Sequence, residues 1–258
     1  DFVVYLIDRQ SGALVGGAPL ALENGSSATD LAFSPDGNRL IVPDLSGAVT
    51  VWDLTTDSPA QQSFQAAPGV INGFALDPAG NKMVVIGKNG ATVWPLPEDV
   101  TTSQPAELLS GKDARSVAWS PDGALVAVGD SNGTVSLVGD GRSPVVTLTG
   151  PKGIVKAVAF SPDSTLVAAA IETSNKDLGE STVLVWPIGE DQPSEHFVND
   201  RGTVTSLAFV QDGTAGTHLH FKPARNDLRV GDRVRVKGTS TPGLYFPGVD
   251  VLELELLG

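Results

Sequence analysis

The sequence predicts an all-β protein assembled from stacked copies of one small sheet. Two observations lead to this prediction. A short apolar run followed by a Ser-Pro-Asp-Gly turn, or a variant of it, occurs five times, with turns that begin at residues 34, 77, 120, 161 and 210. The spacings of 43, 43, 41 and 49 residues indicate one repeated supersecondary unit. Such a unit is too small to bury its own apolar face, so it must pack against its neighbours.

The five copies share an apolar run that ends in a bulky residue just before the turn. They are Leu31–Gly37, Phe74–Gly80, Val117–Gly123, Val158–Ser164 and Leu207–Gly213. Proline presets φ in these turns, and glycine tolerates a positive φ. We expect the bulky residues to occupy equivalent buried positions at the ends of the innermost strands, between adjacent units. These residues are Phe33, Leu76, Trp119, Phe160 and Phe209.

Each unit reads as a small antiparallel sheet. In the second copy the expected strands are Ile71–Leu76, Met83–Ile86 and Ala91–Trp94, which are rich in Val, Ile, Ala and aromatic residues and bounded by turn residues. The turn after the second strand also recurs every 43 residues, as Ser46-Gly47, Asn89-Gly90 and Asn132-Gly133, which is the chemistry of tight hairpins. No twelve-residue stretch has a helical period.

The third strand of a unit ends on a marked position. It carries Trp52-Asp53, Trp94-Pro95 and Trp186-Pro187, while the third unit has Val138-Gly139. A four-stranded unit of about 40 to 45 residues with Trp-Asp at this point resembles the WD40 repeat of β-propellers. The resemblance covers roughly residues 2 to 210 and implies about six four-stranded blades, with a share of a seven-bladed ring as the alternative. Ser-Pro-Asp-Gly blades of TolB-like proteins are a related class, but the tryptophans favour WD40.

The sequence departs from the WD40 pattern in two ways. No Gly-His precedes the first strand of a unit, and the Asp of Trp-Asp occurs only once. The buried His–Ser–Asp–Trp network typical of WD40 blades therefore cannot form in most units. We expect apolar packing to hold these blades together.

Composition excludes several classes of protein. The 258 residues contain no cysteine, which excludes disulfides, thiol nucleophiles and Cys-ligated metals. No run of eighteen apolar residues could span a membrane, and no basic-then-apolar leader opens the chain. These features favour a soluble, cytoplasmic protein. Because the chain starts at Asp1 and its first unit lacks two strands, we expect it to be a segment of a longer protein.

The net charge of −13 is unevenly spread. Residues 211–258 contain six basic and six acidic residues, so the excess acid belongs to the repeats. An acidic propeller is a poor match for nucleic-acid backbones and suits a basic protein surface. The alternative is that this charge only keeps the protein soluble.

The fourth unit carries about seven extra residues in the segment 172–180, between its second and third strands. This polar segment should form a hairpin that extends beyond the rim. Loops on a rigid scaffold often bind partners, so Glu172, Asp177 and Glu180 are candidate contacts for a basic partner. A tolerated insertion without a function is the alternative.

The repeat pattern fails after Gly213, which predicts repeats over 1–213 and a divergent β segment over 214–258. The stretch Val230–Gly238 resembles the opening strand of small OB-like or SH3-like barrels. Two interpretations follow. Arg233–Lys237 or Val249–Leu257 pairs with Phe2–Ile7 and closes the ring, or the segment begins a barrel that contacts nucleic acid. The candidate contacts of such a barrel are Arg229, Arg233 and Arg235.

No residues in the chain suggest catalysis. His218 and His220 share one side of a strand, but no third ligand follows nearby, so we expect no metal. There is no Gly-x-Ser-x-Gly elbow, and the acidic residues of the turns recur in the repeats, which marks them as structural. The sequence therefore predicts a non-catalytic scaffold without a cofactor, which binds a protein partner as part of a larger protein or assembly. The alternative is an accessory propeller fused to a barrel that contacts nucleic acid or serves an enzyme.

Overall fold

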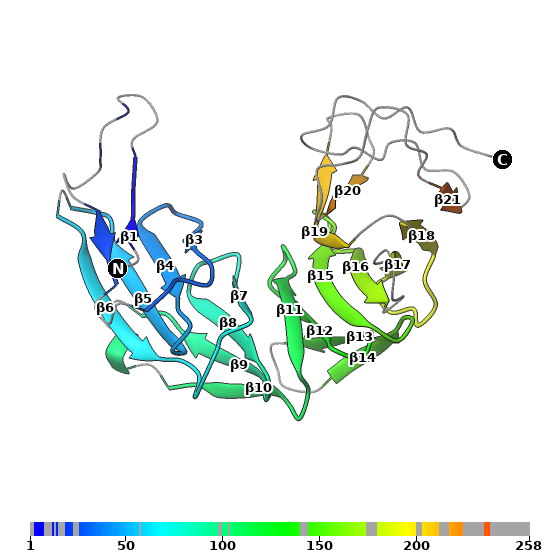
Figure 1. Ribbon diagram of the computed structural model, residues 1–258, viewed down its shortest axis with the longest axis horizontal. Coiled ribbons are helices and arrows are strands. Elements are labelled where there is room, and N and C mark those ends of the chain that lie inside the picture. Colours follow the sequence, from blue (N-terminus) through cyan, green and yellow to red (C-terminus); the bar gives the residue numbers. More distant parts are fainter. Residues whose placement is uncertain are drawn as a thin grey trace.

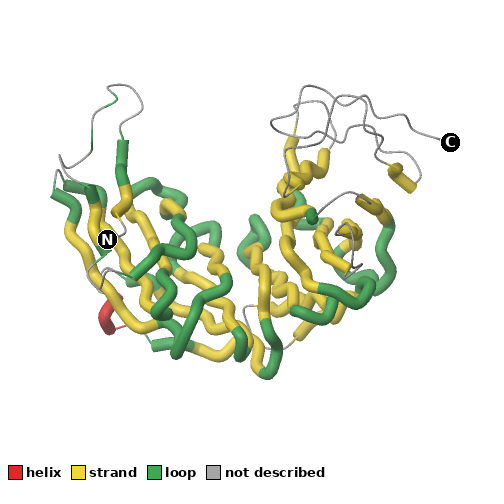
Figure 2. The backbone as a smooth tube through the Cα atoms, in the orientation of Figure 1, coloured by secondary structure: helices red, strands yellow, loops and turns green. Residues whose placement is uncertain are grey.

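The computed structural model describes most of the chain, and strands dominate the described part (Figure 2). The described residues are 3–7, 12, 14, 19–22, 26–56, 58–97, 100–102, 104–139, 144–173, 180–199, 203–211, 217–223 and 235–237. Within these ranges the helical structure is one turn of 3-10 helix, Val100–Thr102. The predicted all-β fold is confirmed. In the same ranges no helix is long and apolar enough to cross a membrane.

Four antiparallel sheets, called blades 1 to 4, follow one another along the chain, and in each the strands pair in chain order. Blade 1 contains β3 (Ala32–Phe33), β4 (Arg39–Pro43), β5 (Ala48–Asp53) and β6 (Ala60–Gln65). Blade 2 contains β7 (Gly73–Leu76), β8 (Lys82–Gly87), β9 (Gly90–Pro95) and β10 (Ala106–Ser110). Blade 3 contains β11 (Ala114–Trp119), β12 (Leu125–Asp130), β13 (Thr134–Gly139) and β14 (Pro144–Thr149). Blade 4 contains β15 (Ile154–Phe160), β16 (Leu166–Thr173), β17 (Glu180–Pro187) and β18 (Glu195–Asn199).

The blades lie side by side along an arc (Figure 1). Two smaller strand pairs stand at its ends: β1 (Val3–Val4) with β2 (Leu20–Ala21), and β19 (Val204–Gln211) with β20 (Thr217–Pro223). The first strands of successive units contact one another, β7 with β11, β11 with β15, and β15 with β19. These are therefore the innermost strands, and the arrangement is that of propeller blades.

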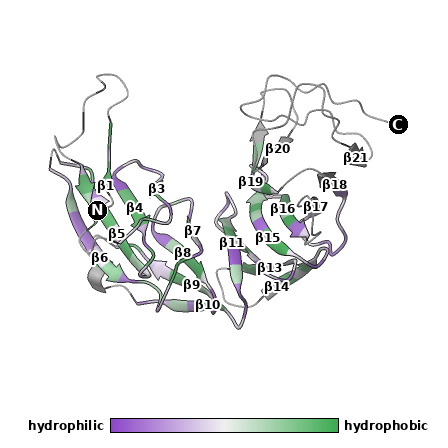
Figure 3. Ribbon diagram, viewed as in Figure 1, coloured by the Kyte–Doolittle hydropathy of each residue, from purple (hydrophilic) through white to green (hydrophobic). Residues whose placement is uncertain are grey.

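Blades 2 and 3 are buried on both faces, because each packs against a blade on either side, whereas blades 1 and 4 pack against a blade on one side and a strand pair on the other. On β8, Met83 lies in an apolar cluster with Ile41 of blade 1, whereas the next residue, Val84, lies in a cluster with Val126 of blade 3. Successive side chains of a strand point to opposite faces, so both sets must be apolar. The central strands accordingly include strongly hydrophobic residues (Figure 3).

The tryptophans that end the third strands, Trp52, Trp94 and Trp186, are buried. Trp186 is fully enclosed between blades 3 and 4, yet its Nε1 has no hydrogen-bond partner among the described residues. In blade 2, Nε1 of Trp94 donates to Oγ1 of Thr92, 3.2 Å away and two residues earlier. The residue two before Trp186 is Leu184, which has no acceptor. Among the described residues, blade 4 therefore holds its tryptophan by packing alone.

The predicted burial of the five bulky strand ends is only partly right. Phe160 is 8% exposed, whereas Leu76, Trp119 and Phe209 are half-buried against the clusters between blades. Phe33 is 48% exposed, and for this residue the prediction is wrong. The reason is that β3 is two residues long and packs mainly against β4 of its own sheet.

The predicted closure of the ring by Arg233–Lys237 is also wrong. The strand β21 (Arg235–Lys237) pairs with β18 as a fifth strand of blade 4, and Val3–Val4 pairs with β2 instead. The outer edge of β18 offers unpaired backbone groups that a further strand can satisfy. The other predicted closing segment, Val249–Leu257, lies outside the described residues.

Candidate functional site

The loops between strands fall on two faces of the arc. One, called the turn face, carries the Ser-Pro-Asp-Gly turns between the first two strands of each blade. The other, called the hairpin face, carries the β4–β5, β8–β9 and β12–β13 hairpins and the loops that lead from one blade into the next. Backbone bonds join these two kinds of loop, since the Ala66 amide donates to the Gly47 carbonyl at 2.9 Å and the Gly150 amide to the Gly133 carbonyl at 2.9 Å.

The acidic residues of the turn face are engaged in the turns themselves. Ser120 Oγ donates to Asp122 Oδ1 at 2.6 Å and accepts from the Leu125 amide at 2.9 Å. Ser161 and Asp163 make the equivalent bond at 2.5 Å. The serine hydroxyl is the main reason that the pKa of Asp122 and of Asp163 lies below its ordinary value. These carboxylates therefore stabilise the blade.

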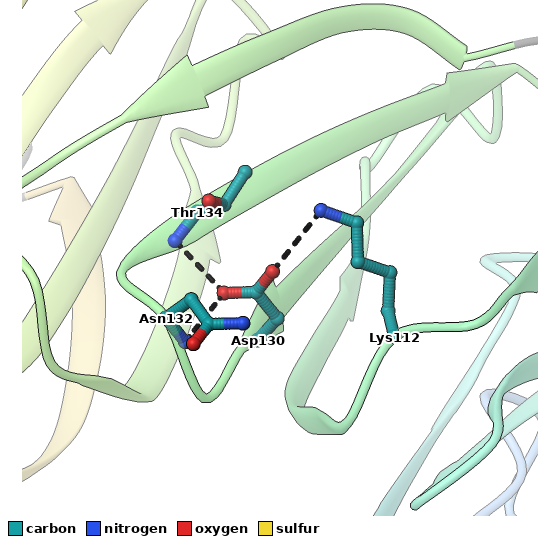
Figure 4. A network of polar contacts seen from close by, with 4 residues as sticks. All are labelled: Lys112, Asp130, Asn132 and Thr134. Carbon is teal, nitrogen blue, oxygen red and sulfur yellow. Dashed lines mark hydrogen bonds and ion pairs between the residues drawn. The ribbon is translucent and has the colours of Figure 1, made fainter.

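On the hairpin face, blades 1 and 3 each bury an aspartate at the start of the hairpin. Asp44 Oδ1 accepts from the amides of Ser46 and Ala48 at 2.8 and 3.1 Å. Asp130 Oδ1 accepts from the amides of Asn132 and Thr134 at 2.8 and 3.0 Å. Figure 4 shows these two contacts together with Lys112, whose Nζ reaches Asp130 Oδ2.

Blade 2 lacks this carboxylate. Its hairpin reads Gly87-Lys88-Asn89-Gly90, where blade 3 has Asp130-Ser131-Asn132-Gly133 at a spacing of 43 residues. The hairpin is also shorter, since Gly87 pairs directly with Gly90. The hairpin of blade 2 therefore differs from the hairpins of blades 1 and 3.

A cavity of about 670 Å³ lies beside this hairpin. Its lining comes from three stretches that are distant in sequence: the loop into blade 2 (66–72), the β8–β9 hairpin and its flanks (85–92), and β10 with the loop into blade 3 (107–115). Val70 stands at the cavity with 53% of its surface exposed. We call it the blade 2 cavity.

Charged groups line the blade 2 cavity from two sides. Lys88 comes from the hairpin, and Glu107, Asp113 and Arg115 come from β10, the loop that follows it and β11. Arg115 Nη2 donates to Asp113 Oδ2 at 2.6 Å, while Asp113 Oδ1 is buried and has no hydrogen-bond partner among the described residues. The cavity thus joins an apolar wall to groups that can bind polar ligands, as binding pockets do.

The structure places Glu172, one candidate of the fourth-blade insertion, in contacts within the fold. Glu172 Oε2 lies 3.0 Å from Lys156 Nζ, and Oε1 accepts from Thr203 Oγ1 at 2.7 Å. The Thr203 hydroxyl is the main reason that the pKa of Glu172 is lowered, and the Lys156 ammonium adds to it. Glu172 therefore links three segments of the fold, and its role in partner binding stays a prediction.

The two other predicted contacts whose backbones are described, Glu180 and Arg235, are not among the residues that line the blade 2 cavity. Glu180 opens β17 and Arg235 opens β21, and only their backbones are described. Asp177, Arg229 and Arg233 lie outside the described residues. Within the described ranges, no three His, Asp or Glu side chains gather as a metal site would require.

Reasoning from the sequence did not identify the blade 2 cavity. One signal was available, because aligning the hairpins at the period of 43 residues sets Gly87 against Asp44 and Asp130. The rest of the lining could not be assembled, since the three stretches meet only in the folded blade.

Comparison with known families gives matches to one repeat model. The model of the "WD domain, G-beta repeat" matches residues 20–53, 104–138 and 142–186. The last two stretches each begin near the outermost strand of one blade and continue through three strands of the next, so the sequence repeat is offset from the blade. Between the first two of these stretches lie β6 of blade 1 and β7 to β9, the greater part of blade 2.

Several curated proteins are similar to parts of the chain. The WD repeat-containing protein VIP3 of Arabidopsis thaliana is 28% identical over 146 residues, which cover 51% of this chain and 45% of VIP3. An uncharacterized WD repeat-containing protein of Synechocystis is 29% identical over 165 residues, 62% of this chain and 44% of its own length. Protein HIR1 of Cryptococcus neoformans is 27% identical over 173 residues, 58% of this chain and 19% of HIR1. The aligned part thus spans less than half the length of each of these relatives.

Proposed function

Since the chain belongs to the WD40-repeat family, we propose that it is a non-catalytic scaffold that binds a protein partner on its hairpin face, at the blade 2 cavity. WD40-repeat proteins are in general not enzymes. The observation that supports the proposal best is the cavity itself, because it lies where the chain departs from its own repeat. A binding site needs groups that are not already committed to holding the blades together.

On the turn face, the polar side chains of the turns are already engaged. Its serine and aspartate side chains bond to one another and to the backbone of their own turn. The hairpin face of blade 2 carries exposed Val70 and Lys88 beside the partly buried Asp113.

We also propose the insertion of blade 4 as a secondary contact for a basic partner surface. Asp177 and Glu180 would carry this contact, with Glu172 anchoring the base of the hairpin through Lys156. Replacing Asp177 and Glu180 by Ser should slow association and weaken its salt dependence, because rim charges act mainly on the association rate. Unchanged association kinetics would remove the insertion from the binding surface.

For the domain organisation we propose that residues 1–213 form the propeller repeats. The segment 214–258 either completes the last blade or begins a small barrel. The described pairings of β19 with β20 and of β21 with β18 join parts of this segment to the repeats, which supports the first of these possibilities.

The experiment is an affinity capture from cells that produce the protein, with a matched pair of variants. Val70→Asp places a charge at the blade 2 cavity, and Ala79→Asp places the same charge at an exposed site on the turn face. We expect Val70→Asp to lose the captured protein and Ala79→Asp to retain it. Equal capture by both variants, or loss by Ala79→Asp alone, would overturn the proposed site.

A further inference from the structure

The blade 2 cavity lies where a carboxylate of the repeat is missing. Blades 1 and 3 begin their hairpins with the buried carboxylates of Asp44 and Asp130, and blade 2 has Gly87 at this position. We propose that the cavity binds a carboxylate side chain of the partner protein, which takes the place of the missing aspartate. This inference rests on the proposed function and names the chemistry of the partner.

In the neighbouring blades the carboxylate accepts hydrogen bonds from the hairpin backbone. Asp130 Oδ1 lies 2.8 Å from the Asn132 amide and 3.0 Å from the Thr134 amide. At the spacing of 43 residues the equivalent amides of blade 2 belong to Asn89 and Ala91, and Ala91 lies within the sheet, paired with Ile86 and Leu109. No described residue accepts a hydrogen bond from the amide of Asn89 or of its neighbour Lys88, and both residues line the cavity. A hairpin that elsewhere binds a carboxylate of its own chain therefore presents donors to solvent.

One cationic side chain favours an incoming carboxylate, and a second, ion-paired one can add hydrogen bonds. Lys88 is exposed and has no ion pair with a described residue. Arg115 donates to Asp113, which uses one of the five N–H groups of a guanidinium and leaves others for a ligand. A charge-assisted hydrogen bond to a carboxylate is about twice as strong as a neutral one.

The cavity lining also carries two acids. Arg115 and Asp113 form an ion pair and together add no net charge, so the attraction comes from Lys88. Glu107 is exposed on β10, where water screens its charge. In blade 3 a lysine likewise pairs with a carboxylate on the hairpin face, since Lys112 Nζ lies 3.3 Å from the buried Asp130.

The apolar wall determines what can accompany the carboxylate. Val70, which is exposed, and the partly buried Leu109 line the cavity beside the hairpin. A partner segment that presents Asp or Glu next to an aliphatic residue would match both the cations and this wall. The occupant is therefore an acidic segment of a partner protein.

The missing carboxylate can be restored as a test. A Cβ on Gly87 would lie 3.3 Å from the Val70 carbonyl oxygen, so the loop need shift by only a few tenths of an ångström, and the φ of Gly87 is not positive. Gly87→Asp should place a carboxylate in the cavity and block the site from within. Gly87→Asn has almost the same size without the charge and is the matched control.

The probes are N-acetyl-glutamate amide and its neutral isostere N-acetyl-glutamine amide, titrated into the isotope-labelled 258-residue chain. Backbone amide signals of Lys88 and Asn89 report binding by nuclear magnetic resonance. We expect saturable shifts with the glutamate probe and affinity about five-fold or more weaker for the glutamine probe, because the ion pair is lost. Equal affinities, or shifts that do not saturate for either probe, would overturn the inference.

Variants localise the effect. Lys88→Ser should remove the preference for the glutamate probe, and Lys152→Ser, an exposed lysine outside the cavity lining, should keep it. Gly87→Asp should abolish the shifts while Gly87→Asn weakens them less. If Gly87→Asp does not fold, the Lys88→Ser result decides: an unchanged preference overturns the inference.

The two proposals can fail separately. If Val70→Asp loses the captured protein but the two probes bind equally well, the carboxylate inference is wrong and the scaffold site stands. If the probes are distinguished but Val70→Asp still captures the partner, the cavity binds carboxylates and the partner binds elsewhere.

Discussion

Lys112 Nζ lies 3.3 Å from Oδ2 of the buried Asp130, which ties the hairpin of blade 3 to the loop that enters the same blade. The positions 43 residues earlier, in blade 2, are Gly69 and Gly87. Both side chains of the pair are therefore absent from blade 2, and the blade 2 cavity lies in their place. A structural ion pair in one blade corresponds to a candidate binding site in the next.

The first prediction concerns the buried carboxylate of blade 3. Asp130→Ala removes the acceptor of two backbone amides and should lower the free energy of unfolding by about 1–3 kcal/mol, the cost of leaving buried donors unpaired. Lys112→Met removes only the partly exposed partner and should cost less than about 1 kcal/mol. Urea unfolding of both variants measures the difference. A larger loss of unfolding free energy for Lys112→Met than for Asp130→Ala would contradict this assignment.

The second prediction concerns acid. The Ser161 hydroxyl is the main cause that lowers the pKa of Asp163 below its ordinary value of 3.8 in the folded protein, and Ser120 acts in the same way on Asp122. A lowered folded pKa stabilises the protein above the unfolded value, and this stability is lost as pH falls through the folded pKa. Stability should therefore decline as pH falls below 3.8.

The matched variants for this effect are Ser161→Ala, in the turn, and Ser58→Ala, at an exposed position. Ser161→Ala should be less stable at neutral pH and lose less of its stability on acidification, since the pKa of Asp163 is then lowered only by Thr165 and the backbone. Ser58→Ala should follow the original chain. The measurement is the urea midpoint of each protein as a function of pH in the acid range. The same dependence on pH in all three proteins would exclude this mechanism.

The third prediction compares two tryptophans. Trp94→Phe removes the ring volume and the hydrogen bond to Thr92, whereas Trp186→Phe removes similar volume and an N–H without a partner among the described residues. Trp94→Phe should therefore be more destabilising by about 1 kcal/mol, the net value of one hydrogen bond. Thermal and urea unfolding of the two variants measure it. A larger cost for Trp186→Phe would show that its N–H has an acceptor.

The fourth prediction concerns two glycines with similar backbone angles. Gly37 has φ +74°, and a Cβ added there would meet no atom within 4 Å. Gly133 has φ +84°, and a Cβ added there would lie 2.0 Å from the Pro151 carbonyl oxygen. Gly37→Ala should cost about 1 kcal/mol through backbone strain alone. Gly133→Ala should cost clearly more, because the loop into blade 4 must move. Similar losses of unfolding free energy for the two variants, measured with urea, would show that this loop can shift without loss of stability.

Much of the fold could be predicted because the repeat fixes local structure. The turns, the hairpins and the buried tryptophans such as Trp52 follow from residue types that recur at one spacing. Burial at the end of the arc could not be predicted in the same way. Phe33 occupies a repeated position, but its exposure depends on the length and neighbours of β3, which the repeat does not specify.

The candidate site was harder to predict for a related reason. In the sequence Glu172 is one of several charges in an insertion, and nothing local indicates a contact within the fold. Its partners Lys156 and Thr203 come from segments distant in sequence. The blade 2 cavity likewise depends on loops that meet only after folding. Gly87 is the one member of the site that the repeat itself singles out, through the aspartates at equivalent positions.

The most direct test of the scaffold assignment is site-specific photo-crosslinking in cells that produce the protein. A benzophenone side chain is placed at Val70, on the blade 2 cavity, and in a second protein at Ala79, on the turn face. The proposed function predicts a protein adduct that forms from position 70 and not from position 79. An adduct from position 79 alone, or no adduct from position 70 under conditions where the partner is captured, would contradict it.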